Sequence, residues 1–263
     1  RTCGCHVGDS TACAEAGFPD GSWTHDNAAC PFRGHRFTNR QFLESMAGHM
    51  TATPNRSEPK LRYLALGDSY TIGESVEPNQ RWPEQWARMA NEAGGNIQQP
   101  VTVVAQTGWT TDELMQGIAT AGLSGSWDRV SLLIGVNNQY RGRSLENFGA
   151  EFRQLAETAI HLSHHGARRV QALSIPDWGQ TPFGESCGRD RRQIGLEIDA
   201  FNASARAVCE SLHIAFLDIT ELTRQHSRET GMHAEDGLHP SAQMYHFWAK
   251  ALLLTGKFGR LGL

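Results

Sequence analysis

The amino-acid sequence predicts an α/β fold: a three-layer α/β/α sandwich around a five-stranded parallel sheet with strand order 2-1-3-4-5. Two observations lead to this prediction. From Leu61 onward, short apolar runs alternate with longer amphipathic stretches, as in chains whose strands cross over to helices in a parallel sheet. The chain has 263 residues, of which 39% are hydrophobic and 20% charged, so it is long enough to bury one sizeable core.

Five short apolar runs are expected to form the strands, and they occupy residues 62–66, 101–105, 130–134, 170–174 and 214–217. With the usual right-handed crossovers, helices cover both faces and the sheet is flavodoxin-like, which gives the strand order above. Ligands of such sheets bind beyond the carboxyl ends of the strands. Residues that carry chemistry are therefore expected at that edge.

Amphipathic stretches separate the strands, around residues 82–93, 111–121, 145–164 and 193–212, and a last one follows Pro240. The third stretch has the clearest periodicity, because one apolar stripe contains Leu145, Phe148, Phe152, Leu155, Ala159 and Leu162. In the fourth stretch, Cys209 lies on the apolar face, and we expect it to be a small buried hydrophobe.

Residues 1–49 differ from the rest of the chain. Before Met50 the only Val, Leu or Ile residues are Val7 and Leu43, and no strand or helix period is visible. We expect this segment to be an extension of low structure that precedes a domain of residues 50–263, derived from an expression vector or from an over-extended reading frame. The alternative is a small metal or disulfide module, built from four histidines and from Cys3, Cys5, Cys13 and Cys30. Their spacing does not match a known zinc-finger pattern.

Composition and charge exclude some classes of partner. A net charge of -4 and a pI near 6.3 give no broad basic surface, so nucleic acid is not an expected partner. No apolar run approaches the roughly 20 residues that cross a bilayer, and the first residues do not resemble an export signal. The sequence thus predicts no membrane insertion and a cytoplasmic location, and it leaves the oligomeric state open.

Four of the expected strands are followed by residues that could act together in one catalytic site. Ser69 follows the first strand on a tight turn, where its hydroxyl would need a base to become a nucleophile. Gly108 follows the second strand and lets a backbone N–H approach a substrate, and Asn137 follows the third with a side-chain amide donor. Asp236 and His239 come after the fifth strand as an acid and an imidazole three residues apart. Each feature is common alone, but together at one edge they indicate a serine hydrolase.

These segments resemble the ordered blocks of the SGNH hydrolase (GDSL-type esterase/lipase) family. The matching blocks are GDSY at 67–70, Gly108, GVN at 135–137 and DGLH at 236–239, and the likeness covers roughly residues 60–257. The family's first block often ends in Leu where this chain has Tyr70.

The resemblance implies a mechanism and a site. Ser69 would attack an acyl carbonyl while His239 takes its proton, and Asp236 would orient the imidazole ring. The backbone N–H groups of Ser69 and Gly108 and the amide of Asn137 would form the oxyanion hole. No metal or other cofactor is expected. The implied substrates are small-molecule carboxylic esters, in particular short-chain or acetyl esters, with lysophospholipids or acyl thioesters as the alternative.

Two other interpretations compete with this one. Residues 184–188, GESCG, fit the G-x-S-x-G pattern of a nucleophile elbow, but no buried strand precedes them. We therefore expect Ser186 in a surface loop that borders the acyl pocket. The other alternative is a non-catalytic flavodoxin-like binding module that holds a phosphate at the turn of residues 67–73. The pairing of Asp236 with His239 would then have no explanation.

Overall fold

The computed structural model describes residues 59–256 and 258. Its five strands form one parallel sheet in the order β2-β1-β3-β4-β5, as predicted from the sequence. The strands are β1 (Tyr63–Gly67), β2 (Thr102–Ala105), β3 (Arg129–Leu133), β4 (Val170–Leu173) and β5 (Ala215–Leu217). Each observed end lies within one residue of the predicted end.

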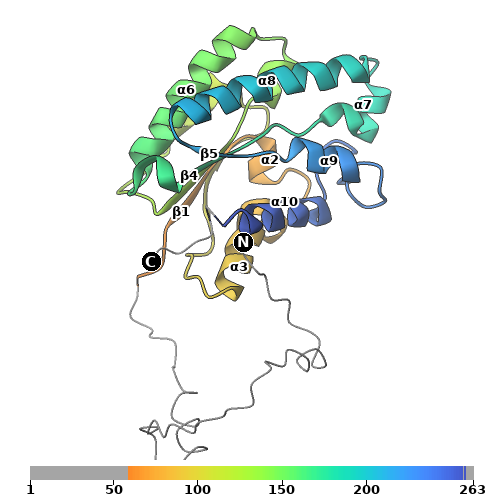
Figure 1. Cartoon of the computed structure of the whole chain (residues 1–263). Helices are drawn as coiled ribbons and strands as arrows, with labels where there is room; N and C mark the ends of the chain where they lie inside the picture. Colours follow the sequence, from red (N-terminus) through yellow and green to blue (C-terminus); the bar gives the residue numbers. More distant parts are fainter. Residues whose placement is uncertain (1–58, 257, 259–263) are drawn as a thin grey trace, which may run out of the picture. The chain divides into compact units, whose positions relative to one another are not determined.

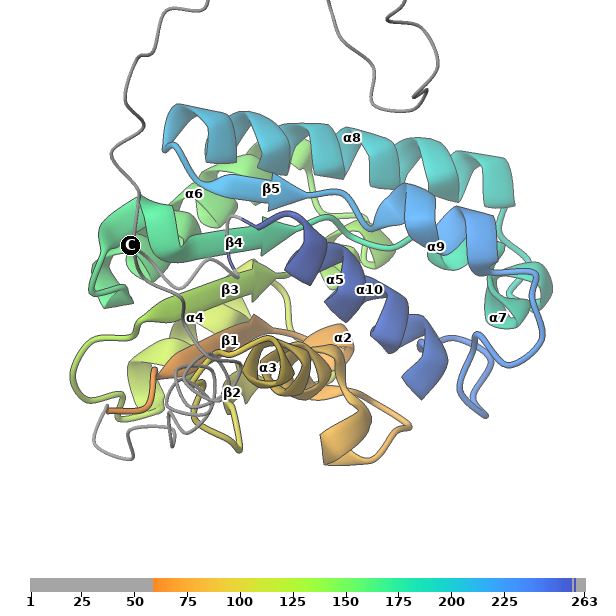
Figure 2. The same ribbon diagram turned by 60° about the horizontal axis from the view of Figure 1, so that its bottom comes forward.

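Helices cover both faces of the sheet (Figure 1). On one face, α3 (Trp82–Glu92) packs against α10 (Ala242–Leu254). On the other face, α4 (Thr111–Thr120), α6 (Leu145–Leu162) and α8 (Arg191–Ser211) lie side by side, with α6 between the other two. Figure 2 shows α3 and α10 in front of the sheet and α4 and α6 behind it, so the three-layer prediction is confirmed.

Several short helices connect these elements, and the sequence pattern did not predict them. They are α2 (Ser69–Ile72), α5 (Val136–Tyr140), α7 (Pro182–Ser186) and α9 (Thr220–His226), with 3-10 turns η1 (Pro78–Gln80), η2 (Gly166–Arg169) and η3 (Trp178–Gln180). None of the four α-helices exceeds seven residues. A helix of two turns or fewer is too short for an apolar period to be recognised.

The core lies between the sheet and its two helical layers. All residues of β1, β3 and β4 are buried. In the predicted stripe of α6, Phe148 and Phe152 are buried, but Leu145 is 41% exposed because it is the first residue of the helix. Cys209 is fully buried in α8, as expected.

The expectations for residues 1–49 and for the start of the domain at Met50 lie outside the described residues. No helix in the described part of the chain is both long and apolar enough to span a lipid bilayer.

Strand register places the candidate residues at one edge of the sheet. The last residue of β1, Gly67, pairs with Ala105 of β2 and Leu133 of β3. The carboxyl ends of these three neighbouring strands therefore lie side by side at the same edge of the sheet. The segments that follow them contain Ser69, Gly108 and Asn137 in turn, so parallel pairing alone brings these segments together.

Candidate active site

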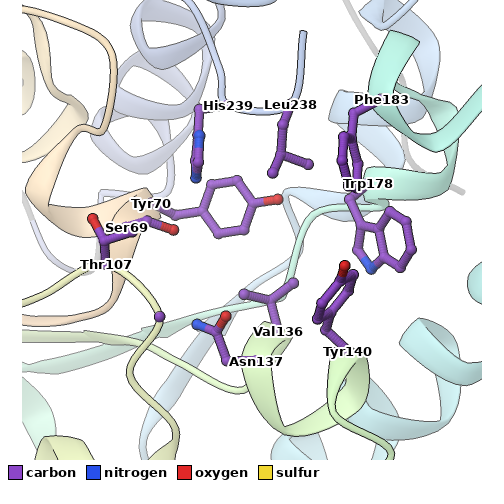
Figure 3. Close-up of a pocket in the computed structure, with 11 residues that line it drawn as sticks. Ser69, Tyr70, Thr107, Val136, Asn137, Tyr140, Trp178, Phe183, Leu238 and His239 are labelled. Atoms are coloured by element: carbon purple, nitrogen blue, oxygen red, sulfur yellow. The ribbon is translucent and has the colours of Figure 1, made fainter. Parts of the chain in front are cut away.

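A pocket of about 230 Å³ contains four of the five residues predicted for the site: Ser69, Gly108, Asn137 and His239. The other residues that line it are Tyr70, Thr107, Val136, Tyr140, Trp178, Phe183 and Leu238. Figure 3 shows that the hydroxyl, imidazole and amide groups lie at one end of the pocket and that Trp178, Phe183 and Tyr140 lie at the other. The pocket thus has a polar end and an aromatic end.

Ser69 begins α2 immediately after the turn that ends β1. A Cβ on Gly67 would lie only 2.2 Å from Thr71 Oγ1 and 2.4 Å from the Leu133 carbonyl oxygen, so only glycine allows the strand to enter the helix this tightly. The carboxylate of Asp68 caps the helix, because its Oδ1 accepts a hydrogen bond from the Tyr70 N–H at 3.1 Å. This turn holds Ser69, which is 5% exposed, in the wall of the pocket.

Asp68 itself is fully buried, and its Oδ2 atom has no hydrogen-bond partner among the described residues. Burial raises the pKa of Asp68 to about 7, although the hydrogen bond from Tyr70 partly opposes this shift. Asp68 does not line the pocket and caps α2, which indicates a structural role for this carboxyl group.

His239 and Asp236 form a close pair. The Nδ1 atom of His239 lies 2.6 Å from Oδ2 of Asp236, and the same oxygen accepts a hydrogen bond from the Ser75 hydroxyl at 2.7 Å. Oδ1 of Asp236 accepts from the backbone N–H groups of Leu238 at 2.8 Å and His239 at 2.9 Å. The carboxylate is therefore fixed by four hydrogen bonds and sits behind the imidazole, outside the pocket lining.

The electrostatics of this pair favour an ionised carboxylate. Partial burial alone would raise the pKa of Asp236, but hydrogen bonds from the His239 ring, from two backbone amides and from Ser75 lower it well below its usual range. A permanently ionised Asp236 holds the His239 ring with Nδ1 as the donor. The other ring nitrogen is then the one available to the pocket.

Gly108 occupies a tight turn after β2. The Trp109 N–H donates to the Gln106 carbonyl at 3.2 Å, and Gly108 has a φ of +86°, which is typical of the third position of a type II turn. Its N–H, like that of Ser69, has no hydrogen-bond partner among the described residues. Two donors are thus left for a group that enters the pocket.

Asn137 and Asn138 are adjacent in α5 but have different environments. The Asn137 amide donates to the Trp109 carbonyl at 2.9 Å and lines the pocket. Asn138 is fully buried, accepts from the Thr111 N–H at 3.1 Å and donates to the Thr111 hydroxyl at 2.7 Å. Asn138 joins α5 to the start of α4, whereas only Asn137 reaches the pocket.

The aromatic end of the pocket was not predicted from the sequence. The rings of Tyr140 and Trp178 meet edge to face at 5.4 Å, and the Trp178 Nε1–H donates to the Gln139 side chain at 2.8 Å. Tyr140 lies three residues after Asn137, and residues at this spacing share a helix face. This spacing would have identified Tyr140 if the short helix α5 had been expected. Phe183 comes from α7, and no sequence signal marked it.

The structure corrects the prediction for Ser186. It is the last residue of helix α7 rather than part of a loop, and its hydroxyl donates to the Phe183 carbonyl at 3.2 Å. The exposed side chain of Ser186 does not line the pocket, and a 3-10 turn rather than a strand precedes α7. The G-x-S-x-G match is therefore not a nucleophile elbow.

Comparisons with known proteins identify the family and the fold of this chain. The sequence matches the GDSL-like Lipase/Acylhydrolase family over residues 65–247. No curated protein gave a significant match.

Solved structures share the fold at low sequence identity. One is a lipase/acylhydrolase from Enterococcus faecalis, with 21% identity, a TM-score of 0.58 and coverage of 75% of this chain and 95% of that one. Another is the acetylxylan esterase Axe2 from Geobacillus stearothermophilus, with 16% identity, a TM-score of 0.56 and coverage of 76% and 94%. The psychrotrophic esterase EstA from a Pseudoalteromonas species has 12% identity, a TM-score of 0.58 and coverage of 75% and 97%.

Proposed function

Because this chain belongs to the GDSL-like lipase/acylhydrolase family and is an ester-bond hydrolase, we propose that it cleaves carboxylic esters with Ser69 as its nucleophile. The observation that carries the proposal is the pairing of His239 with Asp236 at 2.6 Å in the wall of the pocket that Ser69 also lines. We further propose that residues 50–263 are the catalytic domain, since the family match and all five strands lie within them.

In the first step, Ser69 Oγ attacks the acyl carbonyl carbon while His239 accepts the hydroxyl proton. The ionised Asp236 carboxylate keeps the imidazole in the required tautomer and stabilises its charged form. His239 then gives its proton to the leaving alcohol as the C–O bond breaks, which leaves an acyl group on Ser69. Water then attacks the acyl carbon while His239 accepts one of its protons. The bond from the acyl carbon to Ser69 Oγ breaks, His239 gives the proton back to Oγ, and the carboxylic acid is released.

The tetrahedral intermediate in each step has a negative oxygen. The backbone N–H groups of Ser69 and Gly108 and the side chain of Asn137 are the donors assigned to it. The two backbone N–H groups have no other partner among the described residues, and the Asn137 amide has a second hydrogen beyond the one given to Trp109. Donors fixed in advance in this way stabilise developing charge without rearrangement.

Pocket size and lining favour small acyl esters. A volume of about 230 Å³ is below the roughly 300 Å³ at which pockets for drug-sized ligands begin. Beyond the polar end, the lining is hydrocarbon and aromatic, with Val136, Phe183 and Leu238 among its members. Short-chain acyl esters fit this space, and one protein of the same fold is described as an acetylxylan esterase.

Covalent labelling tests the nucleophile directly. One of the similar structures is an esterase inhibited by monoethylphosphonate. A fluorophosphonate probe should modify Ser69 in the full chain, as read by peptide mass spectrometry, and p-nitrophenyl esters of increasing acyl length should be hydrolysed fastest at the short end. Labelling of Ser186 in place of Ser69 would overturn the assignment, and an optimum at long chains would overturn the substrate class.

A further inference from the structure

The Tyr70 hydroxyl is a polar group inside the pocket that the proposed mechanism does not use. Tyr70 lines the pocket and is only 3% exposed. No hydrogen bond joins its hydroxyl to another described residue, and its oxygen is not one of the fully buried unpaired atoms, so the hydroxyl is open to the pocket space. Figure 3 shows the ring crossing the middle of the pocket, with the hydroxyl directed away from Ser69 and toward the side of Leu238 and Trp178.

The surrounding structure fixes this hydroxyl in place. The Tyr70 N–H is held by Asp68, and the ring packs edge to face against the His239 imidazole at 5.6 Å and near Trp248 at 6.2 Å. Burial, followed by the nearby charges of Asp68, Asp236 and Asp177, raises the pKa of Tyr70 far above its usual range. The phenol therefore stays protonated and able to donate.

When a ligand fills the pocket and displaces water from this hydroxyl, the donor is left unpaired at a cost in free energy unless the ligand supplies an acceptor. On the pocket side, the Leu238 and Phe183 side chains present only carbon atoms. Tyr70 also borders a cavity of about 10 Å³ lined by Asp177 and Thr181, but no hydrogen bond joins its hydroxyl to either residue. A plain hydrocarbon acyl chain would leave the hydroxyl unsatisfied. An acyl chain with an oxygen atom at the level of Tyr70 would satisfy it.

We propose that Tyr70 donates a hydrogen bond to an oxygen atom of the substrate's acyl chain, so that the enzyme prefers acyl groups with a hydroxyl, ketone or ether oxygen beyond the ester carbonyl. This inference rests on the proposed function, because it takes the Ser69 end of the pocket as the end where the ester reacts. It makes Tyr70 a specificity-determining residue and oxygenated acyl esters the substrate class.

Tyr245 provides a matched control. Its hydroxyl is fully buried and, like that of Tyr70, has no hydrogen-bond partner among the described residues, and its ring packs against Trp248 at 5.2 Å. Unlike Tyr70, it does not line the pocket. Phenylalanine at either position removes one hydroxyl without a protein partner and keeps the ring packing, so both variants are expected to fold.

The experiment compares p-nitrophenyl hexanoate with analogues in which one chain methylene at a time is replaced by an ether oxygen. kcat/KM is measured for the wild type, Tyr70→Phe and Tyr245→Phe, and variants are compared on the same ester so that differences in intrinsic reactivity cancel. Relative to the wild type, Tyr70→Phe should lower the ratio of kcat/KM for the analogue whose oxygen meets the hydroxyl to kcat/KM for the hexanoate, on the order of tenfold. Tyr245→Phe should affect both esters equally.

Two results would count against the inference. If Tyr70→Phe changed kcat/KM by the same factor for the hexanoate and for every oxygenated analogue, this inference alone would be wrong, because the wild-type rates would still support ester hydrolysis. If the wild type hydrolysed no ester of either kind, the proposed function would be wrong and this inference with it. Melting temperatures of the three proteins ensure that rates are compared per folded molecule.

Discussion

Arg141 donates a hydrogen bond from Nη2 to the carbonyl oxygen of Gly108 at 2.7 Å. The same guanidinium contacts Glu113 of α4 at 3.3 Å. Arg143, two residues later, pairs with Asp112 of α4 at 2.6 Å but does not reach the Gly108 turn. Both arginines thus link the segment after α5 to α4, and Arg141 alone of the two also fixes the peptide that follows Gly108.

Arg141→Ala should lower kcat on the order of tenfold with little change in KM, because a displaced Gly108 turn no longer aims its N–H at the oxyanion. Arg141→Lys should keep part of the kcat that Arg141→Ala loses. Arg143→Ala is the control and should leave kcat within about twofold, since exposed ion pairs contribute little. Steady-state kinetics and melting temperatures decide the matter: if both alanine variants lost melting temperature equally and kept kcat, Arg141 would be only a structural link.

Ser69→Ala should abolish ester hydrolysis, with a loss on the order of a millionfold in kcat, because no other group can form the acyl-enzyme. Ser186→Ala should stay within a few-fold of the wild type, since Ser186 is exposed at the end of α7 and outside the pocket. Rates are to be measured on purified, folded protein with p-nitrophenyl acetate. Normal turnover by Ser69→Ala would refute the mechanism.

The sequence predicted the sheet well because its signal there is strong. Short apolar runs at regular distances, joined by stretches with a helical period, leave few alternatives once right-handed crossovers are assumed. The short helices α5 and α7 were missed for the opposite reason. A helix of five residues, as in PFGES at 182–186, has no room for an apolar period, and proline and glycine suggest a turn instead.

The candidate site likewise contains residues that the sequence predicted and residues that it did not. Ser69, Gly108 and Asn137 come shortly after three neighbouring parallel strands, so the topology alone places them at one edge. Trp178 and Phe183 come from segments whose path depends on tertiary contacts, such as the hydrogen bond of the Phe183 N–H to the Gly237 carbonyl at 3.0 Å. The sequence contains no local signal for such a contact. The polar end of the pocket was therefore predictable, and its aromatic end was not.

Asp68 gives a prediction about pH and stability. Burial raises the pKa of Asp68 to about 7 from an ordinary value of 3.8, so the folded state binds a proton that the unfolded state releases between these pH values. The wild type should therefore lose stability relative to Asp68→Asn as the pH rises from about 4 to about 7, and the difference should level off above that.

Asp68→Asn keeps an oxygen that can accept from the Tyr70 N–H, so the cap of α2 is retained. At pH 8 this variant should melt roughly 2–4 °C or more above the wild type, and the difference should shrink toward pH 4. Melting curves across this pH range test it. A wild type that gained stability over the variant with rising pH would mean that the ionised carboxylate is favoured in the fold, contrary to its missing partner at Oδ2.

The side-chain amide of Asn137 has two hydrogens that it can donate. One is donated to the Trp109 carbonyl at 2.9 Å, next to the Gly108 turn, and the other remains for the oxyanion. Both hydrogen bonds of the Asn138 side chain go to Thr111, in a buried position between α5 and α4. Loss of the two side chains should therefore harm different properties.

Asn137→Ala should lower kcat by roughly 100-fold to 1000-fold, about 2.7 to 4 kcal/mol, with little effect on KM, because a donor to the oxyanion acts mainly in the transition state. Since it also releases Trp109, it should cost about 1 kcal/mol of stability. Asn138→Ala should lose more stability, because it leaves the buried Thr111 N–H without a partner and removes one of the two contacts of the Thr111 hydroxyl, which still donates to Glu151. It should keep its turnover per folded molecule. Values of kcat, KM and melting temperature for both variants separate these effects. If Asn138→Ala had the lower kcat, the oxyanion donor would be misplaced by one residue.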